Sequence, residues 1–249
     1  MFWRPKLKTK IVRVPILPFG MVNCHLLVGE HGCVLVDAGL PGSAGKIGSA
    51  LRQCGRNWED LKLIVITHAH VDHAGSAAEI RSLSGAPILA SDGDLDYYAR
   101  RRPMTFCDTG WFGKLFLKTG LILQPYEGFT PGILLRQGES VDLQAYGVAG
   151  KAVHTPGHTA GSVSVLLDDG NALVGDLLAS GMLLGGLIRT GRAIRPPFED
   201  DPAQVARQLG HLLAAGCNCF YMGHGGPLPA DETRRHAERL ATLARGDAQ

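Results

Sequence analysis

The sequence predicts an α+β protein that forms one domain over residues 1–249, and three observations support this fold class. Short runs of β-branched and other apolar residues alternate with segments of helical composition. The hydrophobic fraction of 45% and the charged fraction of 19% are close to the averages of globular proteins. A chain of this length can bury a large core, and one domain with two packed sheets commonly reaches this size.

Turn residues separate the expected elements from one another. Pro41 and Gly42 mark the turn before the first helix, and Asp92 or Asp94 is expected to cap a later one. The run Asp168-Asp169-Gly170 favours a tight hairpin turn. The expected strands are 11–16, 22–28, 33–36, 61–66, 87–90, 163–167, 172–174 and 219–221, and the expected helices are 43–54, 74–83, 202–213 and 231–244.

The run from Thr67 to His73, with the sequence Thr-His-Ala-His-Val-Asp-His, contains four residues that can bind a metal. Residues two apart do not share a face of a helix, so the run is expected on the loop between strand 61–66 and helix 74–83. A polar surface loop that happens to be rich in His is the alternative interpretation. Because a metal needs several ligands, distant partners decide between the two.

Three such partners follow apolar, strand-like stretches of the chain. They are His158 in Pro-Gly-His-Thr, Asp176 in Val-Gly-Asp and His224 in Gly-His-Gly. Each lies next to Gly or Pro, which is typical of a strand that ends in a tight loop. His154 stands four residues before His158, but Pro156 forbids a regular helix between them. We therefore expect His154 beside the site or in the core, and not as a ligand.

The order His-x-His-x-Asp-His, then Gly-His-Thr, Gly-Asp and Gly-His-Gly, resembles the metallo-β-lactamase superfamily over about residues 23–227. The resemblance implies a four-layer αβ/βα sandwich, with two mixed β-sheets packed face to face, helices outside and metals at the sheet edge. It also matches Asp37 to a strand-end Asp that we expect to hold a ligand or loop in place. By the same resemblance, His68, His70 and His158 bind one metal, Asp72, His73 and His224 bind a second, and Asp176 bridges the two.

This ligand set implies hydrolysis. Two divalent cations that share a water lower its pKa towards about 7, which supplies a metal-bridging hydroxide without a protein nucleophile. The cations also polarise a carbonyl or phosphoryl oxygen of the substrate. Asp72 is expected to relay a proton as a catalytic residue. Two Zn²⁺ ions are the expected cofactors, and iron or manganese suits the same ligands.

We expect the substrate to be a small ester, lactone or thioester. Asp176 stands where dedicated zinc β-lactamases have Cys or Ser, so β-lactam hydrolysis is expected only as a weak side activity. Ala179 stands where acyl-homoserine lactonases have Tyr, although Tyr221 could reach the site. Only residues 225–249 follow His224, the last candidate ligand, which argues against a glutathione thioesterase resembling glyoxalase II. The alternatives are a mononuclear iron oxidoreductase resembling persulfide dioxygenases, and a binding role with a dead site.

Two segments lie outside the expected metal scaffold. Segment 97–130 contains an apolar stretch from Trp111 to Leu123. This stretch is too short and too charged to span a bilayer. The segment is expected to be a lid, a pocket wall or a dimer contact, with a buried core helix as the alternative. Segment 177–198 follows Asp176 and is expected near the metals. Its residues Arg189, Arg192 and Arg195 either bind an anionic substrate or are solvated.

Charge and composition exclude some partners. The net charge of +2 provides no strong field for nucleic acid. The six cysteines lack a zinc-ribbon or redox spacing and are expected to be buried thiols. No apolar signal region follows the basic N-terminus, so a cytoplasmic location is expected. The expected partner is a small-molecule substrate, with no nucleic acid and no membrane, and a homodimer stays open. Two groups of basic residues are expected at the solvated surface. The first is Arg4, Lys6, Lys8 and Lys10, and the second is Arg100, Arg101 and Arg102.

Overall fold

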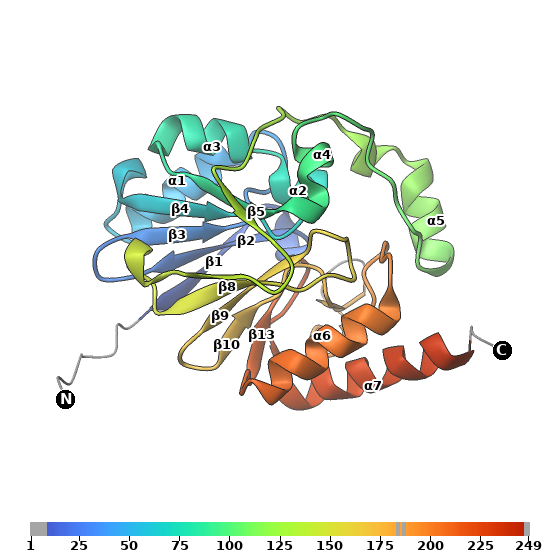
Figure 1. Ribbon diagram of the computed structural model, residues 1–249. Helices are drawn as coiled ribbons and strands as arrows, with labels where there is room; N and C mark the ends of the chain where they lie inside the picture. The colour runs from blue at the N-terminus through green and yellow to red at the C-terminus, as the bar shows by residue number, and fades with distance from the viewer. Residues whose placement is uncertain (1–8, 183–184, 186–187, 247–249) are drawn as a thin grey trace.

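Two mixed six-stranded sheets lie face to face, with helices on their outer sides (Figure 1). This computed structural model describes residues 9–182, 185 and 188–246, with only the backbone of 244–246. Arg4, Lys6 and Lys8 therefore lie outside the described residues, as do 183, 184, 186 and 187 of segment 177–198. The arrangement confirms the α+β class and the four-layer sandwich that the sequence implied.

The first sheet has the order β1-β2-β3-β4-β5-β6. Strands β1, β2 and β3 pair antiparallel, and β3 to β6 pair parallel. The parallel strands direct their carboxyl ends to the same edge, where the loop after β4 carries the His-rich run. The bounds are β1 (Lys10–Pro15), β2 (Asn23–Val28), β3 (Cys33–Val36), β4 (Leu61–Val65), β5 (Ile88–Ser91) and β6 (Ile133–Leu135).

The second sheet has the order β14-β13-β10-β9-β8-β7, and β10 with β13 is its parallel pair. The expected hairpin across Asp168 to Gly170 is present, since β9 and β10 pair antiparallel. A separate ribbon joins β11 (Ala179–Ser180) to β12 (Ala193–Ile194). The bounds are β7 (Ser140–Asp142), β8 (Gly150–His154), β9 (Val163–Leu167), β10 (Asn171–Leu173), β13 (Cys219–Tyr221) and β14 (Leu228–Pro229).

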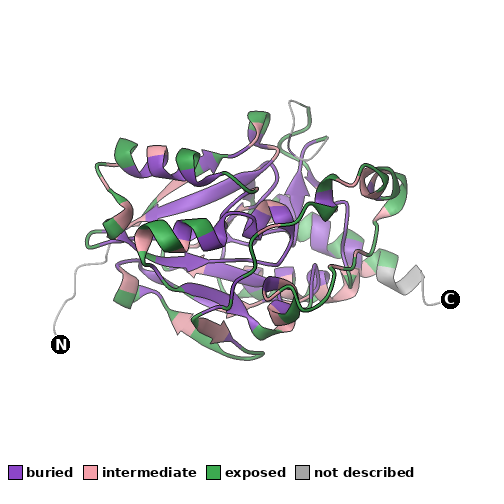
Figure 2. Cartoon of the chain, turned by 90° about the horizontal axis from the view of Figure 1, so that it is seen from above, coloured by how far each residue is buried: buried purple, intermediate pink, exposed green. Residues whose placement is uncertain are grey.

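Helices α1 and α3 cover the outer face of the first sheet, and α6 and α7 cover that of the second (Figure 1). Exposed residues gather on the outward sides of the helices, while the inner strands of the sheets are buried (Figure 2). The described helices are all too short or too polar to cross a bilayer. The α-helices are α1 (Ala44–Gln53), α2 (Val71–Ala74), α3 (Ala77–Ser84), α4 (Leu95–Tyr98), α5 (Gly110–Lys118), α6 (Pro202–Ala214) and α7 (Ala230–Gly246), and the 3-10 helices are η1 (Pro18–Gly20), η2 (Trp58–Asp60), η3 (Asp92–Asp94), η4 (Leu121–Leu123) and η5 (Gln144–Tyr146).

The core has one layer on each side of each sheet. Along β3, Leu35 packs under the outer helices, whereas Val34 and Val36 face the second sheet. Strand side chains alternate between the two faces, so a strand covered on both sides must be apolar throughout. This explains why β3 is a continuous apolar run. Val165 and Leu173 of the second sheet complete the central layer.

The single helix expected over 74–83 is wrong, because the chain forms α2 and α3 with a break at Gly75 and Ser76. A side chain at Gly75 would place its Cβ 2.6 Å from the carbonyl oxygen of Gly39. The Ser76 hydroxyl donates to the carbonyl of Leu40 at 2.7 Å and accepts from the amide of Ser43 at 2.9 Å. Contacts with the β3–α1 connection thus override the helical composition.

The cysteines are free thiols, as expected, but their burial differs. Cys24, Cys33 and Cys217 are buried and Cys54 and Cys219 are partly buried. Cys107 is exposed, so the prediction of a buried thiol is wrong there. The side chains of Lys10 and of Arg100, Arg101 and Arg102 are exposed, as the sequence predicted.

Candidate metal centre

The seven side chains singled out in the sequence gather at one end of the two sheets. The loop after β4 carries two of them and α2 carries the next two. The other three follow β8, β10 and β13, so both sheets contribute. All seven lie within three groups of neighbouring donor atoms: His68, His70 and His158; His68, His73 and Asp176; and Asp72, His73 and His224.

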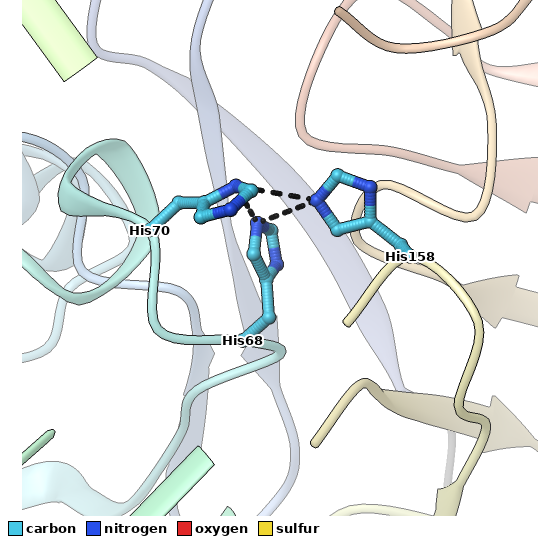
Figure 3. A group of neighbouring side chains, drawn as sticks. All are labelled: His68, His70 and His158. Atoms are coloured by element: carbon cyan, nitrogen blue, oxygen red, sulfur yellow. Dashed lines mark hydrogen bonds between the residues drawn. The ribbon is translucent and has the colours of Figure 1, made fainter. Parts of the chain in front are cut away.

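The first group is a triangle of imidazole nitrogens from His68, His70 and His158 (Figure 3). His68 Nε2 lies 3.0 Å from His70 Nδ1, and His158 Nε2 lies 3.2 Å from both. Nitrogens bound to one tetrahedral zinc at 2.0–2.1 Å are about 3.3 Å apart, so the triangle has the size of three metal ligands. Burial lowers the pKa of His70 to about 3 and that of His158 to about 4. Both rings are therefore neutral at pH 7, as metal binding requires.

Asp72, His73 and His224 form another group, here called the second group, and the group of His68, His73 and Asp176 overlaps both. His224 Nε2 lies 3.3 Å from Asp72 Oδ2, and His73 Nε2 lies 3.9 Å from the same oxygen. Asp176 reaches both groups, since its Oδ2 lies 3.1 Å from His224 Nε2 and 3.9 Å from His158 Nε2. A carboxylate placed between the two groups is where a bridging ligand would stand.

Charge in the second group suits a divalent cation. Burial acts to lower the pKa of His224, but Asp176 and Asp72 outweigh it and raise that pKa to about 10. Burial acts to raise the pKa of Asp72, but His73 and His224 hold it below its usual range. The Oδ1 atom of Asp72 is buried without a hydrogen-bond partner among the described residues. A cation would replace the protons on these imidazoles and satisfy that oxygen, so the donor set fits a metal.

Asp37 holds His73 in place, as the sequence predicted. Its Oδ2 lies 2.8 Å from His73 Nδ1, which leaves Nε2 of that ring facing the site. Its Oδ1 accepts from the Thr67 amide at 2.8 Å, and its Oδ2 accepts from the Thr67 hydroxyl at 3.0 Å. The residue has a positive φ of 65°, which is uncommon outside glycine, and the Ala38 amide donates to the His73 carbonyl beside it.

Asp94 has a role that the sequence did not reveal. It precedes α4 but makes no capping bond there, so the expected cap is wrong, and Ser91 caps η3 instead. Its buried carboxylate accepts from the Ala69 amide at 3.0 Å, the Thr159 hydroxyl at 2.9 Å and the Gly161 amide at 3.0 Å. Asp94 thus ties the loop of His68 and His70 to the loop of His158.

Asn23 has a similar role on the other side of the site, which the sequence did not reveal. Its Nδ2 donates to the carbonyls of Gly20 at 3.0 Å and Gly225 at 3.2 Å. Its backbone amide donates to the Gly223 carbonyl at 2.8 Å. These bonds fix the loop that carries His224. A lone Asn at a strand start gives no sequence signal for such a contact.

The pocket beside these groups has an apolar wall. Five candidate ligands line one side, and Phe116, Ile122, Pro197 and Phe198 line the other. The wall therefore comes from both segments outside the metal scaffold, 97–130 and 177–198. The alternative of a buried core helix in the first segment is wrong, because Trp111 of α5 is 76% exposed.

The arginines of segment 177–198 are mostly engaged elsewhere. Arg195 pairs with Glu199 at 2.8 Å, and Arg192 with Glu232 at 3.4 Å. Both carboxylates are buried, so these arginines neutralise structural acids. Arg189 is exposed.

Tyr221 and His154 lie away from the candidate ligands. Tyr221 packs against the ring of His25 and hydrogen bonds with Cys219, and it does not line the pocket, so the expectation that it reaches the site is wrong. His154 bonds to the Ala160 carbonyl, at 2.9 Å from its Nε2. It is not among the grouped donors, as expected.

Comparison with known proteins agrees with this geometry. The family model for the metallo-β-lactamase superfamily matches residues 17–224, so the chain belongs to this superfamily of hydrolytic enzymes and is a metal-dependent hydrolase. "Probable metallo-hydrolase YflN" of Bacillus subtilis is 28% identical, over 85% of this chain and 82% of the relative. The uncharacterized protein YobT of the same organism is 31% identical, over 82% of this chain and 83% of the relative.

A solved structure shows the same fold. The metallo-β-lactamase superfamily protein ST1585 from Sulfolobus tokodaii superposes with a TM-score of 0.64 at 21% identity, covering 93% of this chain and 86% of that one.

A "Hydroxyacylglutathione hydrolase" from Albidiferax ferrireducens is 29% identical, over 81% of this chain but 60% of the relative. The chain spans less than two thirds of that relative's length.

Proposed function

We propose that this hydrolase uses two divalent metal ions, with zinc as the first choice, to cleave a small ester, lactone or thioester. The observation that carries the proposal is the convergence of seven buried or nearly buried donors into two adjacent groups. In this proposal the first metal binds to His68, His70 and His158, the second binds to Asp72, His73 and His224, and Asp176 contacts both.

The chain's own residues would position the substrate and manage a proton. When bound, two divalent cations lower the pKa of a shared water and polarise the bond to be cleaved. Asp72 is the group proposed to relay a proton, because one of its two carboxylate oxygens is enough to bind the metal and the other then stays free. Phe116, Ile122 and Phe198 exclude bulk water from the other side of the pocket.

The pocket wall favours a small, neutral reacting group. Apart from the candidate ligands, the described residues that line it are apolar, and Arg192 and Arg195 are paired with buried glutamates. A charged acyl group would be desolvated there without a partner. Relatives named hydroxyacylglutathione hydrolase, which match 81% and 87% of this chain, support the thioester among the three substrate classes.

The test combines metal content with a substrate panel. Metal-free protein is reloaded with zinc, iron or manganese and assayed with lactones, thioesters, esters, phosphodiesters and β-lactams. The proposal predicts two metals per chain and hydrolysis of an ester, lactone or thioester. Asp176→Ala is expected to lose metal and to lower kcat/KM by at least about 100-fold, because even residues behind the ligands cost 10–100-fold.

Asp168→Ala is the matched control, since Asp168 is an exposed carboxylate on the β9–β10 hairpin. It is expected to behave as wild type. Fewer than two metals per chain at saturation, or full activity in Asp176→Ala, would contradict the proposal. Oxygen uptake on a persulfide with the iron-loaded protein would favour the oxidoreductase alternative. The expected single domain, small-molecule partner and cytoplasmic location stay predictions.

A further inference from the structure

Helix α5 has an outward face that no described residue covers. Trp111 is 76% exposed and Leu115 is 54% exposed, and Lys114 and Lys118 are exposed beside them. The spacing of these four residues, at i, i+3, i+4 and i+7, places them on one side of the helix. The next turn, η4, adds Leu121 and Leu123, which are 54% and 56% exposed. We call these six side chains the α5 face.

The charge of this face has one sign. Between Thr109 and Tyr126 the sequence contains Lys114 and Lys118 and no Asp or Glu. The described salt bridges do not include either lysine. An apolar face with an indole and flanking lysines has the composition of a helix that lies in the interface of an anionic membrane, where lysines meet lipid phosphates and the indole lies at headgroup level.

From this face we propose that α5 and η4 dock onto an anionic lipid surface. A second copy of the chain is a poorer occupant, because a two-fold contact would bring Lys114 and Lys118 against the same lysines without a carboxylate between them. The expectation of no membrane partner rests on the length of the apolar stretch. A helix that lies in the interface does not need to span the bilayer.

The same segment joins this surface to the metal pocket. Phe116, which stands about 100° further round α5 than Leu115, and Ile122 of η4 both line the pocket. In Figure 1 the helix stands at the periphery of the molecule, beyond α2 and α4. Docking through its outer face would therefore bring the wall of the pocket close to the lipid. An apolar substrate would then have a short path from the lipid to the metal pocket. The docking itself does not depend on the proposed reaction.

The test is co-sedimentation of the full chain with vesicles of phosphatidylcholine, with and without phosphatidylglycerol. Wild type is expected to bind the anionic vesicles at low salt and to be released at high salt. Leu115→Asp is expected to abolish binding. The double variant Lys114→Gln/Lys118→Gln is expected to weaken binding by roughly 10-fold or more, since each lysine near an anionic surface contributes about 1 kcal/mol.

Leu83→Asp is the matched control, because Leu83 is 50% exposed on α3, a helix of the outer layer. It is expected to bind vesicles as wild type does. Quenching of tryptophan fluorescence by brominated lipid chains is expected in wild type and absent in Trp111→Phe. Circular dichroism checks that each variant is folded. If Leu115→Asp does not fold, the double lysine variant still tests the proposal.

Absence of vesicle binding at low salt would overturn the proposal, as would equal loss in Leu83→Asp. A wild-type dimer that Leu115→Asp converts to a monomer would assign the α5 face to a second copy and would also overturn it.

Discussion

Replacing Asp94 with Ala removes the acceptor of three buried donors: the amides of Ala69 and Gly161 and the hydroxyl of Thr159. The hydroxyl of Thr159 can turn to Ser162 Oγ, which lies 3.1 Å away, so two amides are left without an acceptor. Each such buried donor costs about 1–3 kcal/mol. Burial raises the pKa of Asp94, which shows that the carboxylate itself is costly to bury.

Taking both effects together, we expect Asp94→Ala to lower the free energy of unfolding by about 2–4 kcal/mol. The measurement is urea denaturation of metal-free protein, followed by circular dichroism. Because the two loops that Asp94 joins carry His68, His70 and His158, the affinity of the first metal group should also fall, by roughly 10–100-fold. A competition titration with a zinc chelator measures this second effect.

Asp92→Ala is the control, because Asp92 is an exposed carboxylate of the same 3-10 helix. It is expected to change the free energy of unfolding by less than about 0.5 kcal/mol. If Asp94→Ala is as stable as Asp92→Ala and binds metal equally well, Asp94 does not hold the two loops together. A loss of stability with unchanged metal affinity would refute only the claim that Asp94 positions the ligands.

Two further substitutions probe the site and the fold. Gly223→Ala would place a Cβ 2.3 Å from His73 Cε1 and 2.7 Å from Asp176 Oδ1, which would displace these two ligands. Titration calorimetry should therefore show weaker binding of the second metal. Wild-type metal affinity in this variant would contradict the prediction. Burial lowers the pKa of His236 to about 4, below its ordinary 6.5, so stability that is present above pH 6.5 is lost as pH falls through 4. The free energy of unfolding, measured by denaturation from pH 7 to 4, should fall by up to about 3 kcal/mol less in His236→Phe than in wild type. The control His211→Phe, at an exposed site, should lose as much stability as wild type. Parallel curves for wild type and His236→Phe would contradict this prediction.

The seven candidate ligands could be found from the sequence because each follows a strand-like stretch within a few residues and belongs to an uncommon residue pattern. Asp37 was predictable for the same reason. Asp94 was not, since an Asp before a helical stretch normally predicts a cap, and its real partners, Ala69 and Gly161, are distant in sequence. Local composition cannot show which buried donors a carboxylate will meet.

The remaining errors have similar causes. The break at Gly75 depends on the close approach of Gly39, which a local helical pattern does not contain. Strands β11 and β12 have two residues each, too few for any periodicity. In α5 the apolar residues stand on several sides of the helix, so the sequence alone could not show that Phe116 faces the pocket while Trp111 faces outward.

The proposed hydrolysis requires two cations that bind side by side in this pocket. Anomalous diffraction from crystals of metal-loaded protein, recorded at the absorption edge of the metal, tests it most directly. We expect two peaks about 3.5–4 Å apart, one among His68, His70 and His158 and the other among Asp72, His73 and His224. A single peak at full loading, or peaks away from Asp176, would contradict it.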